Sequence, residues 1–318
     1  MNKPSWIHFP ILALRLEVVM LDSFRLPLFA GSLFRGVMGW ALKEVCSPRV
    51  YSYLFETTSN RPGQSDASRP FILVPPTQAR QLRAGDRLTF ELRLLGQGCD
   101  YLPEFTDAVM RAGERGLGKK GARFELNKIL VREGPRSWVC YDSVCGWEQA
   151  YQPLPSALGA FARLPLSHPG TIQLAFETPT RLVIEGEPTR EPSFETVMRA
   201  LYRRLNVLLE VHGGGWDQLT LLDCLDELRE IEATHNVEWV DWERTSNRQR
   251  QRHLMGGLVG VSQYWGPFRP EWLALLAAGE VLNIGKAATF GMGCYHLLFP
   301  EGEASFSSTR SATGPTLL

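Results

Sequence analysis

Apolar residues in the first part of the chain follow two spacings. They alternate over residues 11–21, which predicts a strand. From Leu33 to Val45 they recur every three or four residues, which predicts a helix that begins at Gly31 and ends before Pro48. The following elements are predicted in the order strands 71–74 and 87–95, a helix at about 103–114, and a strand after the glycine-containing segment 116–126. This order of elements is that of a ferredoxin-like unit.

The second part of the chain repeats this order in outline. A strand is expected at 171–177 and a strongly amphipathic helix at 194–212, stopped by three glycines. The remaining predicted elements are a helical pattern at about 217–232, strands near 237–243 and 255–264, a short helix at 271–279 and a final strand at 295–299.

These patterns predict an α+β fold of two tandem ferredoxin-like, RRM-like domains. The segment 148–169 contains four prolines and few charges, so the domain boundary is expected there. We expect an N-terminal domain at 1–150 and a C-terminal domain at 151–300, meeting near residue 155. Residues 301–318 are rich in Ser, Thr and Gly and are expected to be disordered.

Composition excludes several classes of protein. A length of 318 residues with 44% hydrophobic and 21% charged residues suits two globular domains. There is no run of 18 apolar residues, and the N-terminus does not resemble a secretion signal, so we expect a cytoplasmic protein without a membrane partner. The six cysteines form no C-x2-C pair, so we expect reduced thiols and no metal site.

The formal net charge is zero, with 34 Lys+Arg and 34 Asp+Glu, which argues against a protein that coats nucleic acid non-specifically. The charge is nevertheless segregated. Residues 217–243 contain nine acids and one base, whereas 244–253 contain four arginines and no acid, and 111–128 contain six bases and two acids. The two basic segments could form one phosphate-binding groove, or they could be solvated faces with local ion pairs. The candidate RNA-binding residues there are Lys119, Lys120, Arg123, Arg248, Arg250, Arg252 and His253.

The segment from Asn283 to Gly293 is rich in glycine. Its backbone N–H groups could approach a phosphate closely, and Lys286 adds a cation. The spacing fits neither a phosphate loop nor a dinucleotide fingerprint. The glycines could also be simple turn residues. The candidate RNA-binding residues of this segment are Gly285, Lys286, Gly291 and Gly293.

This segment, NIGKAATFGMGCYHL, resembles the glycine-rich C-terminal loop of the RAMP superfamily of RNA-binding CRISPR proteins. The similarity is greatest to the family of endoribonucleases that cut the repeat of precursor CRISPR RNA. Asn283 stands where that family usually has its first glycine. Other segments are similar in the same order, among them FAGSLFRGVMGWALKEVC, GLGKKGARFEL and DWERTSNRQRQRHLMGGLVG, and the resemblance spans roughly residues 11–299.

The resemblance implies two ferredoxin-like domains with RNA over their junction. It also implies cleavage without metal or cofactor, in which the ribose 2′-OH attacks the adjacent phosphate to leave a 2′,3′-cyclic phosphate. Many members place a histidine near the end of the first helix, but this chain has none between His8 and His168. The candidate catalytic residues are therefore Arg25, Arg35, Lys43 and Tyr51, with Tyr53 as a further acid or base.

Three functions remain open at this point. The first is a repeat-cleaving endoribonuclease that stays bound to its RNA product, together with other subunits of a CRISPR effector complex. The second is an inactive RNA-binding subunit of such a complex, which the missing helix histidine allows. The third is a metabolic two-domain protein whose glycine segments are only turns.

Overall fold

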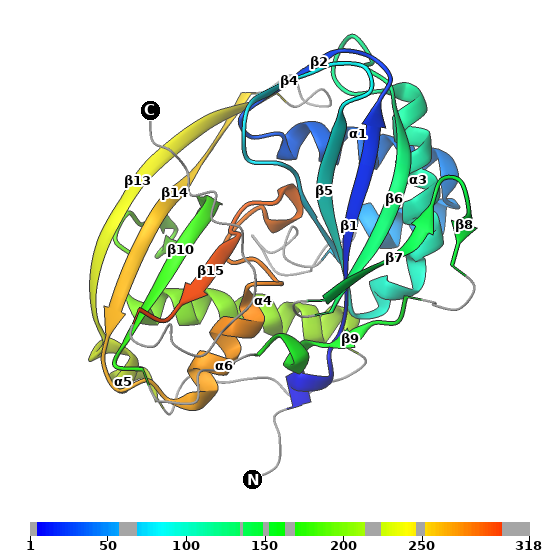
Figure 1. The fold of residues 1–318 in the computed structure, drawn as a ribbon. Coiled ribbons are helices and arrows are strands. Elements are labelled where there is room, and N and C mark those ends of the chain that lie inside the picture. Colours follow the sequence, from blue (N-terminus) through cyan, green and yellow to red (C-terminus); the bar gives the residue numbers. More distant parts are fainter. Residues whose placement is uncertain are drawn as a thin grey trace.

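The chain forms two β-sheets, each covered by helices on one side (Figure 1). The computed structural model describes residues 5–56, 69–133, 136–148, 153–162, 169–213, 224–245 and 252–300. The elements of the first part are η1 (Ser5–His8), β1 (Pro10–Met20), β2 (Phe24–Leu26), α1 (Gly31–Val45), α2 (Pro48–Tyr51), η2 (Ser52–Glu56), β3 (Phe71–Val74), β4 (Arg80–Leu82), β5 (Arg87–Leu95), η3 (Gly96–Tyr101), α3 (Leu102–Arg115), β6 (Phe124–Glu133), β7 (Arg136–Asp142), β8 (Gly146–Trp147), β9 (Ser156–Ala157) and η4 (Leu158–Phe161).

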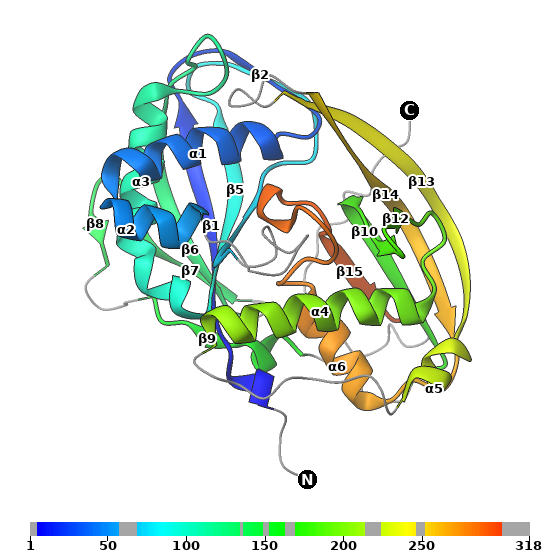
Figure 2. The same cartoon turned by 180° about the vertical axis from the view of Figure 1, so that it is seen from behind.

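The first sheet has the strand order β3-β5-β1-β6-β7-β8, and β9 pairs with the start of β1. Its first four strands have the order of a ferredoxin-like sheet, because β1 lies between β5 and β6 while β3 is at the edge. The apolar positions of β1 and β5 face helices α1 and α3, which lie together on one side of the sheet (Figure 2). The predicted strands 11–21, 71–74 and 87–95 and both predicted helices are confirmed.

The second part repeats this topology. Its elements are β10 (Thr171–Thr180), β11 (Val183–Ile184), β12 (Glu187–Pro188), α4 (Phe194–His212), α5 (Leu225–Arg229), β13 (Glu232–Thr245), β14 (Arg252–Trp265), α6 (Pro270–Gly279), η6 (Ala288–Phe290) and β15 (Tyr295–Leu298). The sheet order is β13-β14-β10-β15, the same permutation as in the first domain. The fold class is therefore α+β with two tandem ferredoxin-like domains.

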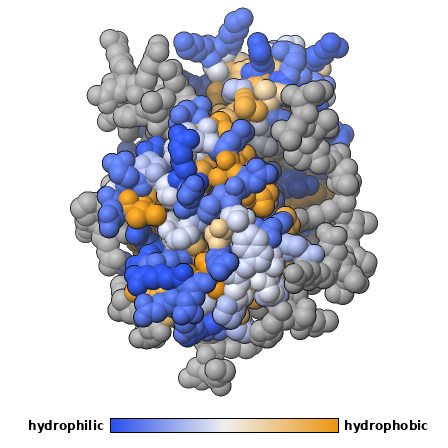
Figure 3. Space-filling view, turned by 90° about the vertical axis from the view of Figure 1, so that its left-hand side faces the viewer, coloured by the Kyte–Doolittle hydropathy of each residue, from blue (hydrophilic) through white to orange (hydrophobic). Residues whose placement is uncertain are grey.

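The two faces of the second sheet differ in polarity. Ile172, Leu174 and Tyr264 are buried against α4 and α6. The opposite face carries exposed Glu232 and Glu238 on β13, and seen from that side the surface is mostly hydrophilic with a few hydrophobic patches (Figure 3). This alternation is expected for an antiparallel sheet with helices on one side.

Three details differ from the sequence expectations. The helical pattern predicted to run to residue 232 is too long, because Glu232 already pairs with Trp265 as the start of β13. Residues 156–157, expected in the C-terminal domain, belong to the first sheet through β9. Two short ribbons, β2–β4 and β11–β12, were not predicted, because three-residue and two-residue strands carry no periodic signal. The expected tail 301–318 lies outside the described residues.

The two domains share apolar packing. Trp6, Phe9 and Ile11, at the start of the first domain, belong to the buried cluster that contains α4 and α6 of the second. Burial of these side chains stabilises the contact between the domains as well as each domain. Among the described helices, none is long and apolar enough to cross a membrane.

Candidate functional site

The glycine-rich segment Asn283–Gly293 connects α6 to β15 and lies where the two domains meet (Figure 2). Its two ends are held together, because the Ile284 N–H donates to the Gly293 carbonyl at 2.8 Å. The segment also contacts the first domain: it packs on β3 through Gly291 and on the start of α1 through Phe290. The segment, expected either to bind phosphate or to form simple turns, is thus also part of the domain contact.

The glycines of this segment face protein backbone. Gly291 has φ +79°, and a Cβ there would lie 2.6 Å from the Leu73 carbonyl oxygen of β3. Gly293 has φ +74°, and a Cβ there would overlap the Ile284 carbonyl oxygen. Both positions therefore require glycine for packing and for backbone conformation. Gly285, at φ +81°, lies against the Arg181 carbonyl in the same way.

Lys286 is the exposed cation of the segment. Its backbone N–H donates to the Arg181 carbonyl at 3.1 Å, which fixes the main chain from which the side chain extends. Lys286 is therefore placed as the sequence predicted, at the surface of a rigid turn. Its contact with RNA stays a prediction, as does that of the three glycines.

Two buried arginines support the start of the segment. Arg93 of β5 is 6% exposed and donates through Nη1 to the Glu280 carbonyl at 2.9 Å and to Asn283 Oδ1 at 2.8 Å. Arg204 of α4 is 2% exposed and donates through Nε to the Leu282 carbonyl at 2.6 Å. Neither residue is predicted from the sequence, because an arginine at a polar position of a strand or helix does not reveal which carbonyl it will meet.

Arg35 is buried, and this burial argues against a direct contact with RNA at the surface. Its guanidinium lies 4.4 Å from the ring centroids of both Phe55 and Phe290, and the residue is only 8% exposed. Because aromatic rings cover the cation, it packs the glycine-rich segment onto α1. The expectation that Arg35 meets the phosphate is thereby corrected to a positioning role.

The other candidate catalytic residues do not gather around it. Tyr51 is buried and stacks on Phe55, with ring centroids 5.6 Å apart. Lys43 is exposed near the far end of α1, roughly 18 Å along the helix from the end that meets Phe290. Tyr51 is thus linked to Arg35 through Phe55, whereas Lys43 lies apart, and the catalytic roles of both residues stay predictions.

Arg25 lies instead beside the predicted basic turn. It is exposed on β2, and the neighbouring Phe24 contacts Gly118 of the turn between α3 and β6. Lys119 and Lys120 are exposed in that turn. The strand that carries Arg25 thus contacts, through Phe24, the turn that carries Lys119 and Lys120.

Arg123 ends the same turn but is engaged in an ion pair. Its Nε donates to Asp22 Oδ2 at 3.1 Å, and its backbone N–H donates to the same oxygen at 3.0 Å. These bonds lower the pKa of Asp22 and hold the turn against the segment after β1. Arg123 therefore stabilises the turn, and RNA would have to compete with Asp22 for its guanidinium.

The second basic segment is described only in part. Arg248 and Arg250 lie outside the described residues, between β13 and β14. The backbone of Arg252 pairs with Thr245 and that of His253 with Arg244, so both residues belong to the end of the β13–β14 hairpin. Their side chains are outside the described part, and their roles stay predictions.

A tyrosine–histidine pair joins the domains at another point. The Tyr53 hydroxyl lies 2.9 Å from His212 Nδ1, and His212 is 1% exposed at the end of α4. Burial raises the pKa of Tyr53 far above its usual value. A phenol that is so difficult to ionise is a poor proton acceptor, which favours a structural role for the pair.

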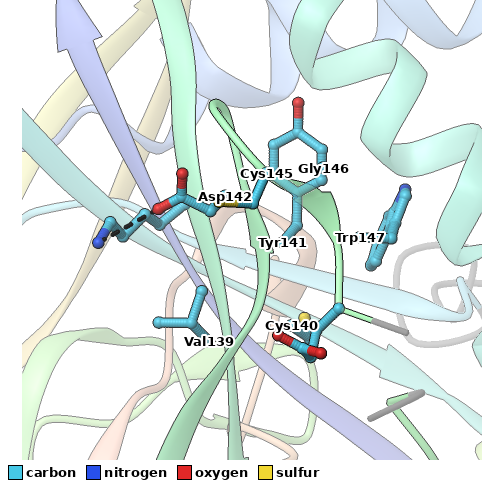
Figure 4. A pocket seen from close by; sticks show the side chains of 9 residues that line it. Val139, Cys140, Tyr141, Asp142, Cys145, Gly146 and Trp147 are labelled. Carbon is cyan, nitrogen blue, oxygen red and sulfur yellow. Dashed lines mark ion pairs between the residues drawn. The ribbon is translucent and has the colours of Figure 1, made fainter. Parts of the chain in front are cut away.

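A shallow hollow of about 470 Å³ lies away from these residues, along β7 and β8 (Figure 4). Tyr141 and Trp147 meet edge to face there, and Lys128 pairs with Asp142 at 3.3 Å. The acidic Asp142 and Glu148 in its lining disfavour a phosphate. This hollow is therefore not the candidate RNA site.

Comparison with known families favours a CRISPR protein over a metabolic one. Residues 174–295, from β10 to β15, match the family model of the CRISPR-associated endoribonuclease Cas6. The C-terminal domain is therefore similar to the Cas6 family. A second family model, AF_1859_N, described as an N-terminal domain, matches residues 9–145. The family resemblance drawn from the glycine-rich segment is confirmed, and the match supports an RNA-cleaving enzyme of CRISPR RNA processing.

The relatives of this chain are distant in sequence. An uncharacterised protein of Archaeoglobus fulgidus is 24% identical over an alignment of 295 residues. The alignment covers 86% of this chain and 93% of that protein. The structure of Thermus thermophilus Cas6 (TTHB231) superposes with a TM-score of 0.54 at 16% identity, covering 91% of this chain and 99% of that one. The Cas6 (TTHB231) product complex gives a TM-score of 0.57 at 19% identity over the same shares. At these identities the structures show a common fold.

Proposed function

We propose that this chain binds the repeat of precursor CRISPR RNA and cleaves it without a metal ion. The observation that carries the proposal is the glycine-rich segment, which is fixed at the junction of the two domains and exposes Lys286. A cation on a rigid turn between two domains is suited to hold one phosphate of an RNA that lies across both.

The basic end of the first domain supports a second contact. Arg25, Lys119 and Lys120 are exposed there and lie on neighbouring segments. Contacts to the RNA backbone fix its register, while unpaired bases near the cut supply the sequence to be read. A folded RNA held at two separate places also fits the zero net charge, because a bounded site needs only local positive charge.

In the proposed reaction the 2′-oxygen of one ribose attacks the adjacent phosphorus. The bond from phosphorus to the 5′-oxygen of the next nucleotide breaks. The proton lost by the 2′-OH is balanced by one gained by the leaving 5′-oxygen, so the products are a 2′,3′-cyclic phosphate and a 5′-OH. Arginine stabilises the charge on the phosphorane but is a poor base. Arg25 is the exposed arginine we assign to this step.

An inactive RNA-binding subunit is the competing function. It is favoured by two observations: α1 contains no histidine, and Arg35 is buried. Retention of the cleaved RNA and assembly with other effector subunits are further parts of our proposal, and they apply to either function.

Incubation with the cognate repeat RNA in EDTA tests the proposal. A single defined cut that leaves a 2′,3′-cyclic phosphate supports it. Tight binding without a cut would favour the inactive subunit instead. A scrambled hairpin of equal length and charge is the control, since equal affinity for both RNAs would exclude recognition of the repeat.

A further inference from the structure

Asn283 has an unusual backbone conformation and a fully engaged side chain. Its φ is +56°, in the left-handed region that asparagine tolerates better than most residues other than glycine. The residue is completely buried. Its Nδ2 donates to the Met292 carbonyl at 2.8 Å, across the base of the glycine-rich segment, and its Oδ1 accepts from Arg93 Nη1 at 2.8 Å. One amide therefore closes the segment and connects it to the other domain.

On the first-domain side of the contact, the guanidinium of Arg93 also donates hydrogen bonds through all three of its nitrogens. Leu92 and Leu94 point into the helix-covered core of the first domain, so the side chain between them points to the opposite face of the sheet. The Nε and Nη2 atoms of Arg93 donate to Glu91 Oε2 at 3.2 and 2.8 Å. Its Nη1 donates to Asn283 Oδ1 and to the Glu280 carbonyl. Burial acts to raise the pKa of Glu91, but the charge and hydrogen bonds of Arg93, together with the charges of Arg132 and Arg15, lower it. The pair thus anchors a charged guanidinium that is aimed at the second domain.

The hydrogen bond between Arg93 and Asn283 fixes the position of the Lys286 main chain relative to the first domain. Lys286 follows Asn283 by three residues, and the residues between them are held by Ile284 N–H to Gly293 and by Gly285 against Arg181. Little freedom remains in the main chain between Asn283 and Lys286. The basic turn with Lys119 and Lys120 belongs to the first domain, so the spacing of the two cationic sites depends on the contact between the domains.

We propose that Arg93 and Asn283 are positioning residues for RNA processing: their hydrogen bond holds the glycine-rich segment in register with the first domain, so that one RNA meets the cations of both domains at once. The inference rests on the proposed function. It gives Asn283 a task that glycine at this position could not perform, because glycine has no side chain to reach Arg93.

Asn283→Gly is the sharpest test, because glycine adopts φ +56° without strain and only the amide is lost. We expect the single-turnover cleavage rate at saturating repeat RNA to fall about tenfold, and the affinity for the RNA to fall by a similar factor, as for loss of about 1.4 kcal/mol. Arg93→Gln should give a loss of similar size, and the double variant should lose little more than either single one. Arg132→Gln is the control, since Arg132 is an exposed arginine of β6 that approaches the same Glu91 at 3.8 Å.

A purely structural role predicts a different result. It would lower the folded fraction but leave the rate per folded molecule unchanged at saturating RNA. Amide hydrogen exchange adds a readout that needs no RNA: residues 284–293 should exchange faster in Asn283→Gly, while the strands of both sheets should not. If the wild type cuts the repeat and Asn283→Gly cuts it equally fast, the inference is overturned and the proposed function stands. If the wild type neither binds nor cuts the repeat, both are overturned.

Discussion

The Arg35 guanidinium lies between the rings of Phe55 and Phe290, 4.4 Å from each centroid. Phe290 belongs to the glycine-rich segment, Arg35 to the first helix, and Phe55 to the turn after it. A side chain that looks like a catalytic candidate in the sequence therefore joins three segments of two domains. Together with Arg93 and Arg204 it makes the glycine-rich segment a rigid part of the molecule.

Replacing Arg35 should test this packing role. Arg35→Ala removes two desolvated cation–π contacts and is expected to lower the free energy of unfolding by about 2–4 kcal/mol. Arg35→Lys keeps the charge and should lose less. Urea denaturation measures both. If Arg35→Ala retains full stability and binding but fails to cleave, Arg35 is catalytic and the positioning role is wrong.

Lys286→Ala should weaken binding of the repeat RNA and reduce its dependence on salt. Removing one phosphate contact lowers the slope of log K against log salt by about 0.7–0.9. Binding titrations at several salt concentrations measure the slope. Arg49→Ala is the matched control, because it removes one exposed charge from α2. An unchanged slope for Lys286→Ala would exclude this lysine from the interface.

Charge removal at the basic turn should act in the same way and more strongly. The double variant Lys119→Ala, Lys120→Ala is expected to lower the salt slope by about 1.4–1.8, as for two lost contacts. The same titration applied to Arg250→Ala and Arg252→Ala tests the hairpin end, for which the sequence alone makes the prediction. A basic turn that does not touch RNA would leave both slope and affinity at the wild-type values.

His296 should make stability depend on pH. Glu177 accepts from its Nε2 at 3.1 Å, and this bond, with the nearby Glu280, raises the pKa of His296 from 6.5 to about 9. A raised pKa in the folded state stabilises the protein fully below about pH 6.5, and this stabilisation is lost as the pH rises through about 9. His296→Gln should therefore differ from wild type in urea denaturation at about pH 6 and converge with it at about pH 10. A difference that is the same at both pH values would contradict this assignment.

Tyr53→Phe should weaken the other contact between the domains. The variant loses the hydrogen bond to His212, at an expected cost of about 1–2 kcal/mol in unfolding free energy, because a buried histidine nitrogen loses a partner. Tyr101→Phe serves as the control, because it removes the hydroxyl of a neighbouring tyrosine. The ring centroids of Tyr53 and Tyr101 lie 5.4 Å apart. Equal stability of the two variants would show that the Tyr53–His212 bond contributes nothing net.

The repeating order of strands and helices was predictable because each ferredoxin-like element is long enough to show its period. The helix from Gly31 to Val45 and the strand from Arg87 to Leu95 have the predicted limits. The order of strands in each sheet then follows from the ferredoxin-like topology. Lys286, Lys119 and Lys120 were also placed correctly at the surface, because a glycine-flanked lysine has little to be buried against.

The tertiary partners of polar residues could not be predicted. Arg35 and Arg25 lie ten residues apart and look equivalent in the sequence, yet the first is enclosed by aromatic rings and the second is exposed. The bond from Arg93 to Asn283 joins residues 190 positions apart, and no local pattern reports such a contact. Asn283 could be noticed only as a departure from glycine, and its reason is visible only in the structure.

The most direct test of the account is cleavage of the cognate repeat RNA in EDTA, with a matched RNA that carries one 2′-deoxy sugar at the nucleotide before the cut. The account predicts a single cut in the all-ribose RNA, with a 2′,3′-cyclic phosphate on its product. It also predicts no cut but undiminished binding for the deoxy RNA, because only the attacking oxygen is missing. Cleavage of the deoxy RNA at the same bond, or a strict need for a divalent metal, would contradict it.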